Sequence, residues 1–82
     1  MECITYYLRC EKYLTDNGEY CISYGIAAGT FEDGVLCVMD SASNVSPDRI
    51  QVERLVDLFN SQNLSLTHFR DVLDDMLNLY IY

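Results

Sequence analysis

Apolar and polar residues alternate along the first half of the chain with the period of two that is typical of β-strands. The alternation is clearest in residues 3–10, CITYYLRC, and residues 20–31, YCISYGIAAGTF. Residues 35–40, VLCVMD, are apolar on both faces. The pattern predicts three strands, and it places the third in a central or well-covered position.

Short polar segments separate these three strands and predict tight turns. Asn17-Gly18 favours a type I′ hairpin turn, because Asn and Gly best tolerate the positive φ that this turn needs at two positions. Asp33-Gly34 forms the tip of the second turn. Sequential hairpins predict a three-stranded antiparallel meander. GIAAG, residues 25–29, lies inside a strand rather than at a helix start, so it indicates a bulge or the close packing of an aromatic ring over Gly25 instead of a phosphate loop.

The pattern changes at residue 40. Residues 40–47, DSASNVSP, form a polar connection without strand alternation. Ser46-Pro47 predicts a helix start, since Ser caps free amides and Pro suits the first helical position. The helix that follows covers residues 48–62, and its apolar stripe has helical spacing: Val52, Leu55, Val56 and Phe59.

A second helix begins near Ser65, and the short link of residues 60–64 favours an antiparallel helix hairpin. Its apolar stripe consists of Phe69, Val72, Leu73, Met76, Leu77 and Tyr80. These elements predict one small α+β domain spanning residues 1–82: a three-stranded antiparallel meander followed by a two-helix hairpin on one face, βββαα. We expect the helix-facing side of the sheet to carry Tyr6, Leu8, Ile22, Tyr24 and Ile26, and the weakly polar opposite side to carry Tyr7, Cys21, Gly25 and Ala27.

Charge and cysteine content narrow the possible functions. The net charge is −8, from 13 acidic and 5 basic residues, and this balance disfavours direct binding to nucleic acid or to an anionic membrane. No apolar run reaches the roughly 18 residues of a membrane span, and no signal-peptide pattern opens the chain. We therefore expect a cytoplasmic protein whose cysteines are reduced structural thiols. Their spacing matches no zinc motif.

The segment THFRDVLDDML, residues 67–77, holds the only histidine of the chain. Asp71 lies three residues after His68, so the pair could orient an imidazole for base catalysis. No nucleophile is positioned beside it, and Asp74 can pair with Arg70 as on any helix surface. We interpret the segment as a solvated helix face, and we expect no enzymatic activity, no cofactor and no metal site.

Three segments together resemble a family of small bacterial proteins of unknown function: YCISYGIAA (residues 20–28), CVMDSASN (37–44) and residues 51–77. Members have a Ser-Tyr-Gly-Ile strand, an Asp-Ile-Ser strand exit and two helices with an acidic His…Asp-Val segment. In place of the tighter exit this chain has Asp40-Ser41-Ala42-Ser43. The resemblance covers residues 19–77. It implies an α+β fold and a bacterial cytoplasmic origin, and it implies no activity or catalytic residue.

Two functions fit these observations. The first is a non-enzymatic protein–protein interaction or regulatory module, whose partner is another protein or a second copy of the chain. The second is an acidic inhibitor that mimics nucleic acid and blocks a nuclease or a DNA-binding protein. The first would use the apolar C-terminal end and the weakly polar face of the sheet, and the second the acidic residues of the second helix. The candidate surface is His68, Asp71, Asp74, Asp75, Tyr80, Ile81 and Tyr82.

Overall fold

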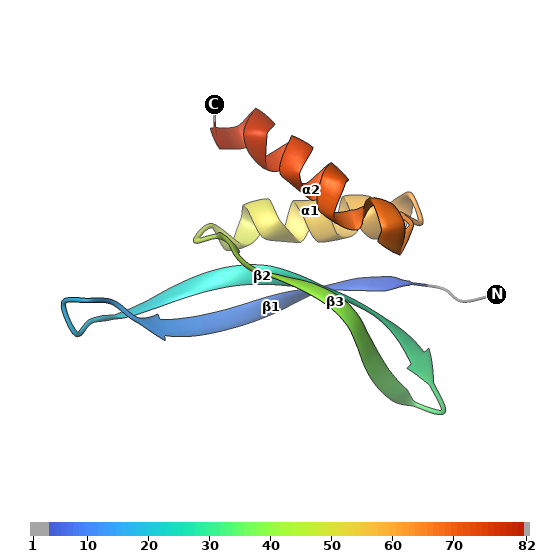
Figure 1. Ribbon diagram of the computed structural model, residues 1–82, viewed down its shortest axis with the longest axis horizontal. Helices are drawn as coiled ribbons and strands as arrows, with labels where there is room; N and C mark the ends of the chain where they lie inside the picture. The colour runs from blue at the N-terminus through green and yellow to red at the C-terminus, as the bar shows by residue number, and fades with distance from the viewer. Residues whose placement is uncertain (1–3, 82) are drawn as a thin grey trace.

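A three-stranded sheet carries both helices on one face (Figure 1). The computed structural model describes the backbone of residues 4–81 and the side chains of residues 4–78. The strands are adjacent and antiparallel in the order β1-β2-β3, so the predicted α+β, βββαα arrangement is confirmed. The elements are β1 (Thr5–Leu14), β2 (Tyr20–Glu32), β3 (Val35–Ser46), α1 (Arg49–Ser61) and α2 (Leu66–Ile81).

Three aromatic rings from three elements form the centre of the core. Tyr6 of β1 lies 5.5 Å from the ring of Phe59 on α1 and 5.3 Å from that of Phe69 on α2, measured between centroids. Edge-to-face and tilted contacts of this kind stabilise a core beyond the burial of area alone. The stripe predicted for the first helix is confirmed, since Val52, Leu55, Val56 and Phe59 are all buried. Of the second stripe, Phe69 and Leu73 are buried, and the Tyr80 side chain lies outside the described residues.

The third strand differs from its prediction in length and position. It continues to Ser46, so the polar connection expected at residues 40–47 is wrong, and it lies at the edge of the sheet rather than at its centre. Two register shifts against β2 explain the missed pattern. Ala42 and Val45 both pack against the core although they are three positions apart along the strand, an odd spacing that a period of two forbids.

The first helix begins two residues later than its sequence signal indicates. Asp48 is the N-cap and accepts a hydrogen bond from the Ile50 backbone N–H at 3.0 Å. The hydroxyl of Ser46 instead accepts from the Asp48 backbone N–H at 3.1 Å and donates to the Gln51 side chain at 2.8 Å. Aspartate is as good an N-cap as serine, so the choice depends on where β3 ends.

Both predicted turns are present, with different geometries. Asp33 and Gly34 have φ of 53° and 79°, so the type I′ turn belongs to the second hairpin. In the first hairpin only Gly18 has positive φ, and its N–H donates to the Thr15 carbonyl at 3.0 Å. The prediction of a type I′ turn at Asn17-Gly18 is therefore wrong. A three-residue loop closes that hairpin, with Gly18 in the left-handed position.

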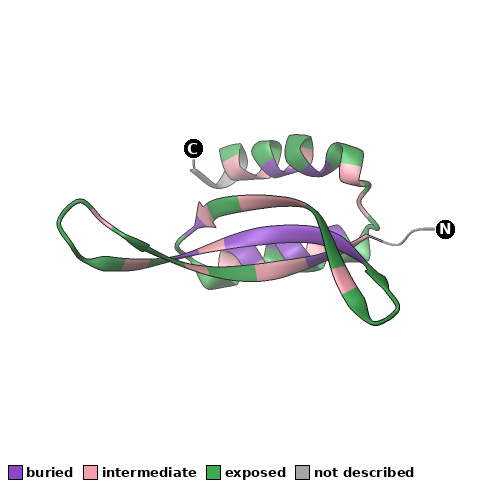
Figure 2. Ribbon diagram, turned by 60° about the horizontal axis from the view of Figure 1, so that its bottom comes forward, coloured by how far each residue is buried: buried purple, intermediate pink, exposed green. Residues whose placement is uncertain are grey.

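Both hairpins extend past the helices as two-stranded arms (Figure 1). Ile22 lies on the β1–β2 arm and is 53% exposed, so its predicted burial against the helices is wrong. On the opposite face of the sheet Tyr7 is half-buried, whereas Gly25 and Ala27 in the middle of β2 are buried (Figure 2). Within residues 4–81 neither helix combines the length and the apolar character that a membrane span needs.

Candidate interaction site

The predicted surface residues of the second helix are exposed. His68, Asp71, Asp74 and Asp75 all lie on α2 with exposed side chains, and none of them forms an ion pair with another residue whose side chain is described. The His68–Asp71 pair considered for catalysis is therefore not formed. Tyr80, Ile81 and Tyr82, the remainder of the predicted surface, lie outside the residues with described side chains.

Arg70 pairs across the fold rather than along its helix. Its Nη2 and Nε donate to the two carboxylate oxygens of Asp40 on β3, at 2.7 and 3.1 Å, and Nη2 also donates to the Ser41 carbonyl at 3.0 Å. The predicted pairing with Asp74 is therefore wrong. Hydrogen bonds from Arg70, together with one from the Ser41 backbone N–H, hold the pKa of Asp40 below its usual value. This two-point contact fixes α2 against β3.

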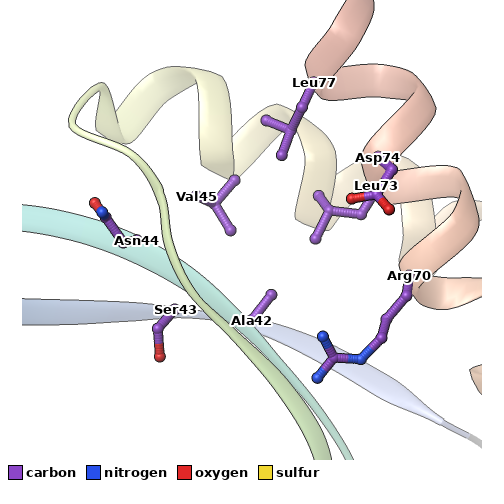
Figure 3. A pocket seen from close by; sticks show the side chains of 8 residues that line it. All are labelled: Ala42, Ser43, Asn44, Val45, Arg70, Leu73, Asp74 and Leu77. Atoms are coloured by element: carbon purple, nitrogen blue, oxygen red, sulfur yellow. The ribbon is translucent and has the colours of Figure 1, made fainter.

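A groove of ≈ 200 Å³ lies between the second half of β3 and α2 (Figure 3). Ala42, Val45, Leu73 and Leu77 form its apolar surface, and these four side chains point into the space between strand and helix in the close-up view. The groove is also lined by polar residues: Ser43, Asn44, Arg70 and Asp74. Because Asp40 neutralises Arg70, Asp74 contributes the groove's unpaired charge among residues 4–78.

A bulge in β3 gives the groove its apolar wall. Asn44 has φ of 54°, and its backbone N–H donates to the Glu11 carboxylate at 3.2 Å. The buried hydroxyl of Ser23 donates to the Asn44 side-chain oxygen at 2.5 Å. A side chain at Gly25 would collide with the Glu11 carboxylate and the Ala42 carbonyl, so only glycine fits there. These contacts on the far side of the sheet let both Ala42 and Val45 face α2.

The sequence indicated this bulge only on the β2 side, at Gly25. Glycine inside a strand indicated a bulge or an aromatic ring packed over Gly25. The bulge is confirmed, whereas the atoms closest to Gly25 belong to Glu11, Ala42 and Ser43 rather than to an aromatic ring. The groove itself was missed, because Ala42 and Val45 stood in a segment that looked like a loop. Arg70 and Asp40 are separated by 30 residues, so the pattern within the helix favoured its local neighbour Asp74.

The groove is too small for most small-molecule sites, which occupy about 300–1,000 Å³. It matches the size of a single inserted side chain better than that of a cofactor. Among the residues that the structure describes, no three His, Cys, Asp or Glu side chains lie close enough together to hold a metal ion. The arrangement therefore suits the binding of an apolar side chain beside a carboxylate.

Fold and groove define a small α+β domain in which a helix pair covers one face of a three-stranded sheet. The chain belongs to the family of unknown function DUF6514, whose family model matches residues 2–79. This match confirms the resemblance to a family of unknown function and extends it through the first strand. No curated protein and no solved structure matches the chain.

Proposed function

We propose that this domain is a non-enzymatic interaction module that binds a short peptide segment of another protein in the groove between β3 and α2. The observation that carries the proposal is the apolar wall of Ala42, Val45, Leu73 and Leu77 beside the exposed carboxylate of Asp74. A pocket that accepts one apolar side chain, with polar groups at its rim, is a common anchor in protein recognition.

The charge of the domain indicates what kind of peptide would bind. A net charge of −8 attracts basic partners and repels acidic ones. At the groove, Asp74 is available to a lysine or arginine of the ligand, whereas Arg70 is occupied by Asp40. We therefore propose a ligand with an apolar anchor residue followed closely by a basic residue. The exposed thiols of Cys10 and Cys37 suit a reducing compartment, and we place this activity in the cytoplasm.

A peptide selection tests the proposal and needs no candidate partner. A phage-displayed library of random peptides is selected on the immobilised protein, and enriched peptides are titrated against the protein by fluorescence anisotropy. We expect enriched sequences with an apolar residue next to Lys or Arg. Asp74→Lys should weaken their binding by about tenfold, because it places a like charge opposite the basic residue.

The matched control is Asp75→Lys, which changes the charge of the same helix equally but does not line the groove. It should weaken binding less than twofold. Equal losses in the two variants would mean that the overall charge, rather than the groove, attracts the ligand. The absence of any enriched sequence would contradict the proposal outright.

A second function, inhibition by mimicry of nucleic acid, is supported by the exposed carboxylates of Asp71, Asp74 and Asp75. Side chains three and four positions apart on a helix have Cβ atoms about 5–6 Å apart, so the three form one compact acidic cluster. We propose that such a cluster would displace DNA from basic proteins. Conversion of all three residues to Asn should abolish displacement of a labelled duplex from a panel of basic DNA-binding proteins. Conversion of three acids elsewhere, Asp16, Glu19 and Glu32, should not.

A further inference from the structure

The first outer strand of the sheet, β1, is protected along its free edge. At Tyr6 the side chain of Asn60 replaces a neighbouring strand: its Oδ1 accepts from the Tyr6 N–H, and its Nδ2 donates to the Tyr6 carbonyl, both at 2.8 Å. Further along the strand Arg9, Glu11 and Lys12 carry charges. Charged residues on an edge strand oppose pairing with another chain. This edge is therefore poorly suited to association.

The second outer strand, β3, is protected only in part. Arg70 occupies the carbonyl of Ser41, and two bulges distort the strand, one at Met39 and one between Ala42 and Ser46. Up to the first bulge, residues 35–38 have the sequence VLCV, with no charge and no proline. They belong to the β2–β3 arm, which extends past the helices (Figure 1). In this segment the free edge of β3 has none of the devices that protect β1.

Side chains on the same arm are unusually apolar for an exposed position. Phe31, Val35, Val38 and Met39 are 61%, 62%, 55% and 50% exposed. The charges of the arm, from Glu32 and Asp33, are confined to its tip. Strand alternation puts Phe31 and Val38 on one face of the arm and Val35 and Met39 on the other, so both faces expose apolar side chains beside the open strand edge.

The backbone geometry of the arm selects one self-complementary register. The pair that closes a two-residue hairpin is hydrogen-bonded, and bonded and non-bonded pairs alternate along an antiparallel ladder. Counted from Glu32–Val35, this alternation directs the N–H and C=O groups of Cys37 toward β2. Leu36 and Val38 then direct theirs outward. A two-fold axis at Cys37 sets Leu36 of one copy opposite Val38 of the other, so that every outward group in this stretch gains a partner.

We propose that two copies of this chain associate through residues 35–39 of β3, in an antiparallel pairing centred on Cys37 that joins the two sheets into one of six strands. In this register Val35 faces Met39 of the second copy, and Leu36 faces Val38. The bulge at Met39 ends the regular alternation, so the paired stretch contains neither Asp33 nor Asp40 and brings no two like charges directly opposite. The groove between β3 and α2 stays open, and the proposal does not depend on the peptide-binding function.

Area and charge set the strength of this contact. A standard interface buries about 800 Å² on each partner, and four half-exposed apolar side chains supply roughly half of that. We therefore expect a weak dimer with a dissociation constant in the micromolar range. Each copy carries a net charge of −8, so added salt should strengthen the dimer by screening the repulsion. A contact made by ion pairs would respond in the opposite way.

Sedimentation equilibrium of the reduced full-length protein tests the association. We expect a monomer–dimer equilibrium that shifts toward dimer between 20 and 500 mM NaCl, by about tenfold in dissociation constant. Val38→Lys should abolish the dimer. Ile22→Lys is the matched control, since Ile22 is a β-branched strand residue of nearly equal exposure on the other arm. It should leave the dimer intact.

Cross-linking tests the register. In a non-hydrogen-bonded pair the two Cys37 Cα atoms would lie about 4.5 Å apart, within the range that a disulfide spans. A variant that keeps Cys37 alone is treated with diamide, which takes two electrons and two protons from a pair of thiols. We expect rapid covalent dimers, and at least tenfold slower cross-linking in a variant that keeps Cys10, also exposed, alone. Adding Val38→Lys to the variant that keeps Cys37 alone should slow its cross-linking by the same factor.

Three outcomes would overturn the proposal. The first is a protein that stays monomeric at several hundred micromolar in high salt. The second is a dimer that survives Val38→Lys and is lost in Ile22→Lys, since it would form through the other arm. The third is equal cross-linking through Cys10 and Cys37. Circular dichroism of each variant shows whether its fold is unchanged, and the exposure of Val38 and Ile22 predicts that it is for their two substitutions.

Discussion

Tyr6 makes three kinds of contact, two through its side chain and one through its backbone. Its ring packs against both helices, its backbone groups bind the Asn60 amide, and its hydroxyl donates to the Leu64 carbonyl at 2.7 Å in the link between the helices. Burial raises the pKa of the hydroxyl, and the negative charge of Asp40 raises it further. The sequence placed Tyr6 correctly on the helix-facing side, but the partner of its hydroxyl, 58 residues away, has no local signature.

We predict that Tyr6→Phe lowers the free energy of unfolding by about 1–2 kcal/mol at pH 7, because the Leu64 carbonyl loses its donor. Because the pKa of Tyr6 is raised in the folded protein, its hydroxyl contributes fully to the free energy of unfolding below the pKa of an unfolded tyrosine, about 10. It is lost as the pH rises through the higher folded value. Urea unfolding at pH 7 and pH 10.5 should therefore show the difference between wild type and variant shrinking at the higher pH. Tyr13→Phe, at an exposed position, should change stability little at either pH; a constant difference for Tyr6→Phe would contradict the role of its hydroxyl.

A helix or strand could be predicted from the sequence where a single hydrophobic period continued along several helical turns or several pairs of strand residues. The stripe of α1 needed only the spacing of Val52, Leu55, Val56 and Phe59, and all four are buried. The second half of β3 was not predictable in this way, since the bulge opposite Gly25 breaks the alternation of Ala42 and Val45. The groove depends on that bulge and on the Arg70–Asp40 contact, which joins elements far apart in the chain. Neither the bulge nor this contact can be predicted from a local sequence pattern, because each depends on the tertiary fold.

The end of α1 and the edge of β1 are joined by the Asn60 amide, and this joint can be tested by one substitution. Asn60→Asp keeps an acceptor for the Tyr6 N–H but sets a carboxylate oxygen against the Tyr6 carbonyl. We predict a loss of about 1–3 kcal/mol in the free energy of unfolding at pH 7, measured by urea denaturation. Part of the lost stability should return near pH 3, where the introduced carboxyl is protonated and can donate a hydrogen bond to the Tyr6 carbonyl. Asn17→Asp adds the same charge in an exposed turn; a similar loss there would show that charge alone is responsible.

The whole molecule is elongated because its two hairpin arms leave the body. Its extents are 47 × 31 × 19 Å, and its radius of gyration is 13.7 Å, whereas a compact chain of this length would have about 12 Å. The helices cover only the middle of the sheet (Figure 2), where Ile26, Ala27 and Ala28 are fully buried. An arm without a helix on either face has little apolar burial to hold it, so its hydrogen bonds should open far more often than those of the body.

Hydrogen exchange followed by NMR can separate this local opening from the proposed self-association. We predict that amides in the middle of β2 exchange slowest and that amides of both arms exchange at least a hundredfold faster in dilute protein, as expected for local opening. When the concentration is raised, the outward amides of Leu36 and Val38 should gain protection, because pairing with a second copy occupies them. The β1–β2 arm around Ile22 should not respond, and Val38→Lys should remove the dependence on concentration. If both arms gained protection together, the β3 edge would not be the contact, and association through the β1–β2 arm or through the sheet as a whole would have to replace it.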